Sequence, residues 1–517
     1  MRHKEIRFSI PFVAVLLVLA ACGGSPDPRG VGGDVDHNKT LRVALTYAPT
    51  TLDPHRSTAP VAGHVYITPL YDRLAQMGPD LVLEPMLATK WSFGEDGRSV
   101  TFSLRDDAKF WDGTSVDAAA VEASLNRAMT LPDSTAAVAL SMIETVEAVD
   151  ATTVKITTNR PAADVPFALA GIEGAVINPK AISSATLDQE PAGSGAYELE
   201  KTRSGDELVL KRHEGYWDQK ANAAKRIMVS GIPNDSSRIN ALRSGQVDLI
   251  MTTVSQYKQA KSLGDSFETH DYPQATTYSV WLNSALPNTD NKLVRQALNW
   301  AIDRQSINTS LLNGQCEPAG QQLAPVFEGH LDDPPISYGY DPAKARKLLA
   351  NAGVPNGFKM KMLVPNGITL YEQMATAIQA QLKDIGVDVE LSPQESATIF
   401  TSWSASKEFG GWLNSRSGKP TSGMTLEANF LNPARYPGPT PEGFGEAVRG
   451  TLNPQLEESE VKASLENASR IGVDNAMDVY ICSAGALWTS TDRVTGADTM
   501  GQSYFTSYGD LRFVGVS

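Results

Sequence analysis

Apolar and polar residues alternate in two short stretches of the N-terminal part of the chain. The apolar positions are Leu41, Val43 and Leu45 in the first stretch and Val100, Phe102 and Leu104 in the second. Because successive side chains of a β-strand point to opposite faces, this alternation predicts two strands, each with one face buried.

Three later stretches place apolar residues at the spacing of one helical face. One of them begins with Asp341 as an N-cap and Pro342 in the first turn, and it ends at Gly353. The apolar faces consist of Ala345, Leu348, Leu349 and Ala352 in this helix, Val294, Ala297, Leu298, Ala301 and Ile302 in another, and Met374, Ile378, Leu382 and Ile385 in the third. The third stretch ends at Gly386 and continues as an alternating strand over 387–391. Alternating helices and strands predict α/β or α+β lobes, of which we expect the α/β class.

The first 21 residues have the organisation of an export signal. Basic residues precede an apolar run over 10–21, which is shorter than the roughly 20 residues that a membrane span needs. Small residues lead up to Cys22, so we expect cleavage before this cysteine and lipidation of its thiol. An ordinary signal peptide with an incidental cysteine is the alternative. Residues 22–38 are rich in Gly, Asp and Pro and predict a flexible tether to an extracytoplasmic membrane surface.

Charge and cysteine content restrict the possible partners. The formal net charge is −14, which repels nucleic acid and anionic lipid, so we expect contact with the membrane only through the lipid anchor. Two of the three cysteines, Cys316 and Cys482, remain once Cys22 is assigned to lipid. In an oxidising compartment they could form a disulfide, or they could be two buried thiols.

Motifs for catalysis and for metal binding are missing from the sequence. We find no HExxH, GxSxG, GxxxxGK[ST] or GxGxxG pattern. The seven histidines have no histidine partner at i+4 and no cysteine partner, so neither a direct metal site nor a cofactor is predicted. We therefore expect a binding protein and not an enzyme, although a catalytic triad assembled from distant residues leaves no local pattern.

A series of short blocks occurs in the same order as in one known family. The blocks are 51–55 (TLDPH), 85–91 (PMLATKW), 102–105 (FSLR) with 110–114 (FWDGT), 193–197 (GSGAY), 215–217 (GYW), 245–248 (GQVD), 294–304 and 340–342 (YDP). Within them, Thr114 and Asp117 resemble a capping box at the start of a helix. Taken together, the blocks resemble family 5 of the extracytoplasmic solute-binding proteins, which serve peptide and nickel ABC importers.

The resemblance implies a two-lobed fold with a hinge, of the periplasmic-binding-protein-like kind (type II, class C). Lobe I is expected over 39–280 plus 489–517, with an extra subdomain inserted at about 71–190, and lobe II is expected over 281–488. It implies a monomer that captures a peptide or peptide-like solute between the lobes and delivers it to a membrane permease driven by an ATPase. Another small solute (a metal chelate, or an acidic or glycosidic compound) and a sensing receptor without transport are the alternatives.

Three segments provide candidates for contact with the solute. They are the loop after the first strand, the strand that crosses between the lobes, and an irregular segment over 410–445 that is rich in Gly, Pro, Asn and Ser. The candidates are Tyr47, Thr50 and Thr51 in the loop, Tyr278, Trp281 and Asn283 in the crossing strand, and Trp412, Asn414 and Arg416 in the irregular segment. Packing in the core is the alternative for the aromatic residues.

Position 415 departs from the pattern of the family. Its peptide binders hold the ammonium of the ligand on an Asp three residues after the Trp, and here that residue is Ser415. An ammonium buried without a carboxylate is unfavourable, so a blocked peptide, a peptide-like product or an acidic solute fits better than a free N-terminus. Arg416 could pair with a carboxylate or phosphate of the solute, or it could lie on a solvated face.

Overall fold

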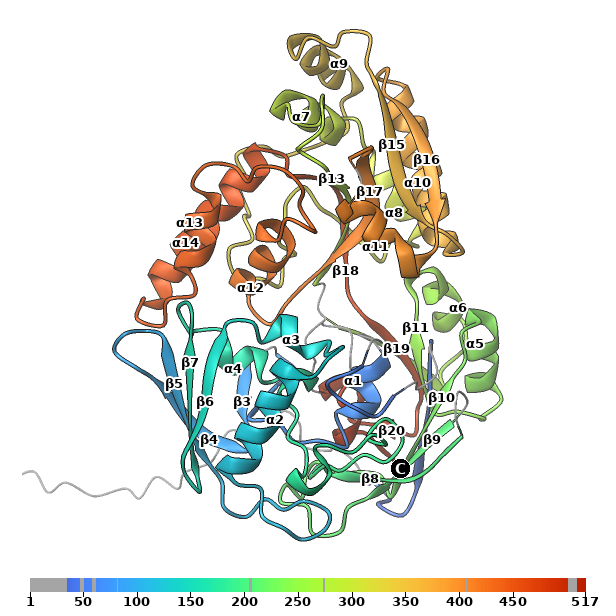
Figure 1. Cartoon of the computed structure of the whole chain (residues 1–517). Helices are drawn as coiled ribbons and strands as arrows, with labels where there is room; N and C mark the ends of the chain where they lie inside the picture. The colour runs from blue at the N-terminus through green and yellow to red at the C-terminus, as the bar shows by residue number, and fades with distance from the viewer. Residues whose placement is uncertain are drawn as a thin grey trace, which may run out of the picture.

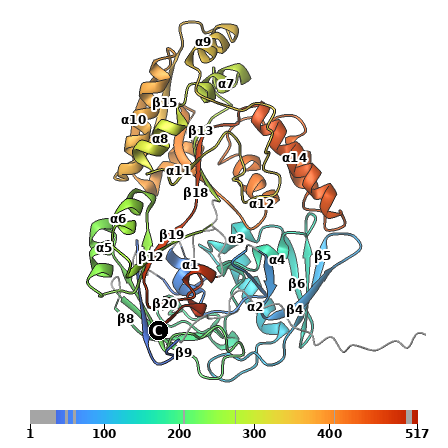
Figure 2. The same ribbon diagram turned by 180° about the vertical axis from the view of Figure 1, so that it is seen from behind.

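The computed structural model describes residues 35–46, 51–57, 62–80, 82–203, 207–272, 275–405, 407–500 and 509–517. Two β-sheets form the centres of two lobes, which lie one above the other in Figure 1 and are seen from behind in Figure 2. The predicted signal peptide, the lipidation site Cys22 and the tether as far as residue 34 lie outside the described residues.

Lobe I, the lower lobe in Figure 1, is built on a seven-stranded sheet of order β12-β19-β11-β1-β10-β9-β8. The strands are β1 (Thr40–Leu45), β8 (Tyr197–Arg203), β9 (Glu207–Arg212), β10 (Arg226–Gly231), β11 (Leu249–Thr252), β12 (Phe267–Asp271) and β19 (Leu487–Thr491). β1 pairs in parallel with β10 and β11, whereas the other neighbours are antiparallel. The first predicted strand is confirmed as β1. Helices α1 (Ala62–Ile67), α5 (Asp235–Arg243) and α6 (Tyr257–Lys261) complete this lobe.

A subdomain with its own hydrophobic core is inserted in lobe I. Its antiparallel sheet has the order β4-β5-β7-β6, from β4 (Ala88–Phe93), β5 (Ser99–Leu104), β6 (Ile143–Asp150) and β7 (Thr153–Thr158). β5 is the second predicted strand. Helix α2 (Ala118–Thr130) packs on this sheet, and Asp117 is its N-cap, accepting a hydrogen bond from the backbone N of Ala120 at 2.9 Å. The predicted capping box of Thr114 with Asp117 is wrong, because the helix starts later and Thr114 donates to Asp112 instead.

Lobe II is built on a six-stranded sheet of order β14-β18-β13-β17-β15-β16. The strands are β13 (Thr276–Leu282), β14 (Glu317–Pro318), β15 (Lys359–Pro365), β16 (Asp388–Gln394), β17 (Phe409–Ser417) and β18 (Asp478–Ala484). β13 is antiparallel to both β17 and β18, and β15 is parallel to both β16 and β17. This mixed sheet, with helices on both faces, agrees with the predicted α/β class.

The predicted helices of lobe II are present. They are α7 (Lys292–Trp300), α9 (Pro342–Asn351) and α10 (Thr369–Lys383), joined by α8 (Arg304–Leu311), α11 (Ser396–Ala405), α12 (Ser422–Leu426), α13 (Phe444–Gly450) and α14 (Glu458–Asp474). Asp341 accepts from the backbone N of Lys344 at 2.9 Å, as an N-cap does. Gly353 and Gly386 follow α9 and α10 with φ of +85° and +87°, a backbone conformation in which glycine avoids the steric penalty of a Cβ atom.

Two neighbouring segments of chain connect the lobes. The first leads from β12 in the sheet of lobe I to β13 in the sheet of lobe II, and the second leads back from β18 to β19. Because β12 pairs with β19 and β13 pairs with β18, the two crossings lie side by side. The crossings fall a few residues before the divisions expected at 280/281 and 488/489, since β13 belongs wholly to lobe II and β19 wholly to lobe I.

Candidate functional site at the junction of the two lobes

The two lobes touch on the side away from the crossing segments. The inserted subdomain meets the chain around α13, where the backbone N of Ala163 donates to the carbonyl of Leu452 at 3.2 Å. An ion pair of 3.3 Å joins Arg160 of lobe I to Glu427 of lobe II. Met424 of α12 packs in the hydrophobic core of the inserted subdomain. Figure 1 shows this contact on the left, with the crossing strands β18 and β19 toward the right. Both lobes therefore contribute residues to the region between these two connections.

Charged side chains of both lobes meet in this region. Glu173 lies in a short 3-10 helix of lobe I (Ile172–Gly174), and Lys419 lies between β17 and α12 of lobe II. Arg435 follows the π-helix Glu427–Leu431 of lobe II. All three side chains keep partial exposure although protein surrounds them. We call Glu173, Lys419 and Arg435 the interlobe charge cluster.

Burial perturbs the ionisation of this cluster. It lowers the pKa of Lys419 to about 8, while the charge of Glu173 opposes the shift and that of Arg435 adds to it. Burial, with the charge of Arg416, lowers the pKa of Arg435 to about 10. Burial raises the pKa of Glu173, although Lys419 favours its charged form. Such shifts result where charges leave water without full compensation by the protein, which is typical of sites that bind a ligand.

An aromatic cluster adjoins the charges in lobe II. The ring of Trp281 lies 4.7 Å from that of Trp412, and Trp403 lies 5.9 Å from Trp412. Trp281 and Trp412 are only 2% and 4% exposed, so both pack in the core, which was the alternative given for these residues. Each of the two nevertheless has an indole N–H that is buried without an acceptor among the described residues.

Arg416 has a structural position in this conformation. Its guanidinium pairs with the carboxylate of Asp478, with Nε–Oδ2 at 2.8 Å and Nη2–Oδ1 at 3.0 Å, and both side chains are fully buried. Nη1 donates to the carbonyl oxygen of Asn429 at 2.9 Å, and the guanidinium stacks 3.7 Å from the ring centre of Trp281. The ion pair ties β17 to β18 across β13. The partners that the described residues give Arg416 all lie in lobe II.

The candidates in the loop after β1 are described only in part. Tyr47 and Thr50 lie outside the described residues. Thr51 is partly exposed, and its Oγ1 accepts from the backbone N of Asp53 at 3.1 Å. Asp53 itself forms a buried ion pair of 2.6 Å with Arg127 of α2. The sequence block at this loop therefore joins the main sheet of lobe I to the inserted subdomain.

The remaining candidates lie on different faces of the sheet of lobe II. Tyr278 is half-buried against the helical layer that contains α10, with its ring 5.9 Å from that of Tyr371. Trp281 points to the opposite face, as expected for residues three apart in a strand. Asn283 is buried and joins the turn after β13 to the start of β17, donating to the carbonyl oxygen of Phe409 and accepting from the backbone N of Ala285. Asn414 keeps partial exposure.

The charge cluster was not among the candidates from the sequence. Lys419 and Arg435 both lie in the segment 410–445, which was expected to be irregular. That expectation is wrong for much of the segment, because it contains most of β17, α12, the π-helix and the start of α13, and Trp412, Asn414 and Arg416 lie in β17. The composition of the segment gave no means of choosing residues within it. Glu173 has no local signal, because its environment is created by the approach of lobe II.

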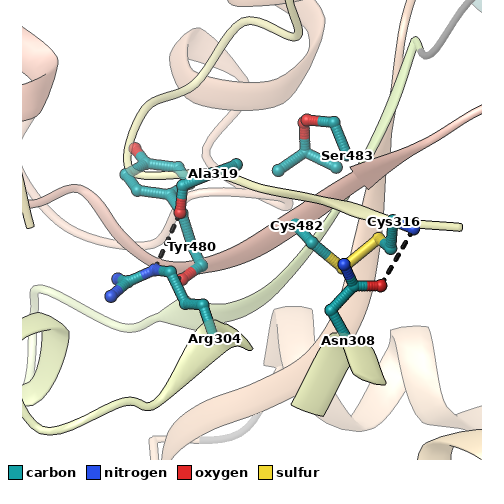
Figure 3. Close-up of a disulfide and its surroundings, with 8 residues drawn as sticks. Arg304, Asn308, Cys316, Ala319, Tyr480, Cys482 and Ser483 are labelled. Carbon is teal, nitrogen blue, oxygen red and sulfur yellow. Dashed lines mark hydrogen bonds between the residues drawn. A yellow bond between two sulfur atoms is a disulfide. The ribbon is translucent and has the colours of Figure 1, made fainter. Parts of the chain in front are cut away.

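A disulfide joins Cys316 to Cys482 within lobe II. Figure 3 shows it between the start of β14 and β18, with the side chain of Asn308 accepting from the backbone N of Cys316 at 3.1 Å. Arg304 lies beside it and donates to the carbonyl oxygens of Ala319 and Tyr480. Two adjoining chain segments 166 residues apart in sequence are thus held together.

Ser490, His270 and Asp498 have the connectivity of a catalytic triad. The Nε2 of His270 is 2.9 Å from the hydroxyl of Ser490, and its Nδ1 contacts Asp498. Ser490 is fully buried in β19, between β11 and β12, so a substrate has no access to its hydroxyl. Glu268 brings a third possible metal-ligand atom near His270 and Asp498. The protein partners of the two ring nitrogens of His270 are Asp498 and Ser490.

A separate cavity of about 410 Å³ lies within lobe II. It is lined by Arg304, Glu317, Gln321, His330, Tyr338 and other residues of lobe II alone, so it is not part of the junction. The guanidinium of Arg304 is occupied by carbonyl oxygens and the side chain of Asn299.

The two hinged lobes and the polar residues enclosed between them define a two-lobed binding protein. Residues 82–437 match the model of the bacterial extracellular solute-binding proteins, family 5 (middle region), and the chain belongs to this family. Proteins of the family bind solutes outside the cytoplasm and work with the permease and ATPase of ABC importers. Within the described residues, no helix combines the length and apolarity needed to cross a membrane.

Relatives and solved structures agree with this assignment. The chain is 29% identical over 396 residues to the glutathione-binding protein GsiB of Salmonella typhimurium, covering 72% of this chain and 76% of the relative. Its fold is similar to that of the periplasmic binding protein DppA from Helicobacter pylori in complex with the peptide STSA (TM-score 0.78, 22% identity, 93% and 98% of the two chains). It is also similar to NikA from Brucella suis in complex with Fe(III)-EDTA (TM-score 0.80, 21% identity, 93% and 100%).

Proposed function

We propose that this protein is the substrate-binding lipoprotein of an ABC importer and that it captures a peptide-like solute between its lobes. Its membership of the family carries the proposal. The relative from Salmonella is named as glutathione-binding, and glutathione is a tripeptide. The donors and acceptors of the interlobe charge cluster suit a solute with several polar groups.

Binding is coupled to closure, because the solute contacts both lobes only when they are together. A shift from 1:99 to 99:1 in favour of the closed form requires roughly 5.5 kcal/mol of differential affinity. Backbone hydrogen bonds of a peptide, formed to both lobes, are of a kind that supplies such a difference. Of the predicted contacts, we retain the partly exposed Thr51 and Asn414 for the solute, together with Tyr47 and Thr50.

The protein acts as a monomer, carries out no catalysis and is anchored by lipid on Cys22. A short apolar leader followed by small residues and a cysteine supports the anchor. The variant Cys22→Ala should fold normally and move from the membrane fraction to the soluble fraction of cells. Cys22→Ala protein that stays with the membrane would contradict lipid anchoring.

The function is tested with purified protein and a panel of solutes. Glutathione and small tripeptides are added in a thermal unfolding assay, and the samples are then analysed by mass spectrometry. We expect a rise in the unfolding temperature with at least one peptide-like solute, and recovery of that solute unchanged. Chemical conversion of the solute, or stabilisation only by solutes unlike peptides, would contradict the proposal.

A further inference from the structure

Arg435 is the member of the interlobe charge cluster whose charge the protein leaves uncompensated. Among the described residues, its guanidinium donates one hydrogen bond, from Nη1 to the side-chain oxygen of Asn429 at 3.3 Å, and no carboxylate pairs with it. A guanidinium has five N–H donors, so most of its capacity is unused. The backbone carbonyl of Arg435 is well bonded, since it accepts from Arg416 at 3.2 Å and from Trp403 at 3.4 Å. The residue is therefore held in place by its main chain.

The neighbouring charges do not provide a counter-ion for Arg435. The carboxylate of Asp478 is occupied by Arg416 in a buried two-point contact. Glu173 faces Lys419 across the junction. Burial and the nearby positive charge of Arg416 both disfavour the charged form of Arg435.

The aromatic cluster of lobe II lies beside Arg435. Its guanidinium is 5.9 Å from the ring centre of Trp281, and Trp412 packs on that ring. The indole nitrogens of both tryptophans are buried without a hydrogen-bond partner among the described residues. Buried donors are rarely left unpaired in native proteins. Arg435 is the partly exposed donor of this group, whereas both tryptophans are packed in the core, so its guanidinium is the group that calls for a partner with negative charge that accepts hydrogen bonds.

We propose that the solute carries a carboxylate that lies against Arg435, next to Trp281, when the lobes are closed. This inference rests on the proposed function and adds the charge of the solute to it. A planar carboxylate matches the fork of a guanidinium. The C-terminal carboxylate of a peptide and an acidic group within the solute share this chemistry.

The same contact links the charge of the solute to closure of the lobes. Closing without an anion would bury Arg435 with no partner, which is unfavourable because charge is costly to remove from water. An anionic solute removes this penalty. Neutral solutes would leave the guanidinium uncompensated and would favour the closed form less.

The test compares matched solutes by calorimetry and thermal unfolding. The probes are glutathione, its C-terminal amide, the analogue in which 4-aminobutyrate replaces the glutamyl residue, trialanine with its amide, and the non-peptides succinate and citrate. Arg435→Gln keeps the main-chain bonds, Arg435→Lys keeps the charge, and Arg470→Gln is the control, because Arg470 is exposed on α14 of the same lobe. Circular dichroism checks that each variant is folded.

We expect a peptide with all of its carboxylates to bind at least tenfold more tightly than the derivative in which one particular carboxylate is removed. The derivative that shows this loss of affinity identifies the carboxylate that contacts Arg435. Arg435→Gln should abolish this preference, Arg435→Lys should retain part of it, and Arg470→Gln should not change it. Binding of succinate or citrate alone, dependent on Arg435, would support the anionic contact while contradicting the peptide-like solute. Equal binding of acids and amides, a preference that survives in Arg435→Gln, or no stabilisation by any anionic probe would overturn the inference.

Discussion

Removal of the cross-link between Cys316 and Cys482 should destabilise lobe II selectively. Both cysteines are fully buried in lobe II, and the bond restricts the unfolded chain between residues 166 apart in sequence. The chain-entropy treatment gives about 5 kcal/mol at 25 °C for a loop of this size, and measured losses are more often about 2–4 kcal/mol. We therefore expect the free energy of unfolding of lobe II to fall by about 2–4 kcal/mol.

The measurement is urea unfolding with and without reductant, followed by hydrogen exchange to separate the lobes. The wild-type protein should unfold at lower urea once the bond is reduced. The variant Cys316→Ala/Cys482→Ala should unfold at low urea in both conditions, which separates the loss of the bond from the loss of packing. Strands of lobe I such as β1 should keep their protection.

Two results would contradict a disulfide that stabilises lobe II. If alkylation and mass spectrometry show both thiols free, and the urea midpoint of the wild-type protein is unchanged by reductant, the bond does not contribute to stability. An equal loss of protection in both lobes would contradict the assignment of the effect to lobe II.

Two further predictions concern buried charges. Arg416→Met leaves the carboxylate of Asp478 buried without its partner and should lower the free energy of unfolding by about 3–5 kcal/mol, as measured by chemical unfolding. The double variant Arg416→Met/Asp478→Asn should recover part of this loss. Equal stability of the single and double variants would contradict the ion pair. Lys419 has a pKa of about 8 in the folded protein against an ordinary value of 10.5, because burial disfavours its charge. Between these two pKa values the unfolded chain therefore binds more protons than the folded protein, so the free energy of unfolding should rise as the pH increases from about 8. Lys419→Met, with Glu173 and Arg435 unchanged, should flatten this rise. A slope that is the same in Lys419→Met would contradict the assignment.

The sequence was sufficient for elements whose signals are local. The alternation at Leu41, Val43 and Leu45 identified β1, and the cap at Asp341 with Gly353 beyond the end identified α9. Near Asp117 the local signal misled, because several residues before α2 are able to cap a helix and only the path of the chain decides between them.

The functional junction depends on contacts between residues far apart in sequence. Arg416 has the chemistry of a ligand contact, and only the position of Asp478, 62 residues later, makes it structural. Arg435 has no such partner among the residues that the structure describes, and nothing in the neighbouring sequence distinguishes the two arginines. The environment of Glu173 is likewise created by lobe II. Local patterns therefore directed attention to residues 410–445 without distinguishing the arginine that pairs with a carboxylate from the one that, among the described residues, does not.

Coupling of closure to binding is tested most directly by small-angle X-ray scattering on the purified mature protein, with and without a bound solute identified by mass spectrometry. We expect a smaller radius of gyration with the solute, because the lobes come together around the junction at Glu173 and Lys419. Identical scattering curves with the solute verified in the sample would contradict it.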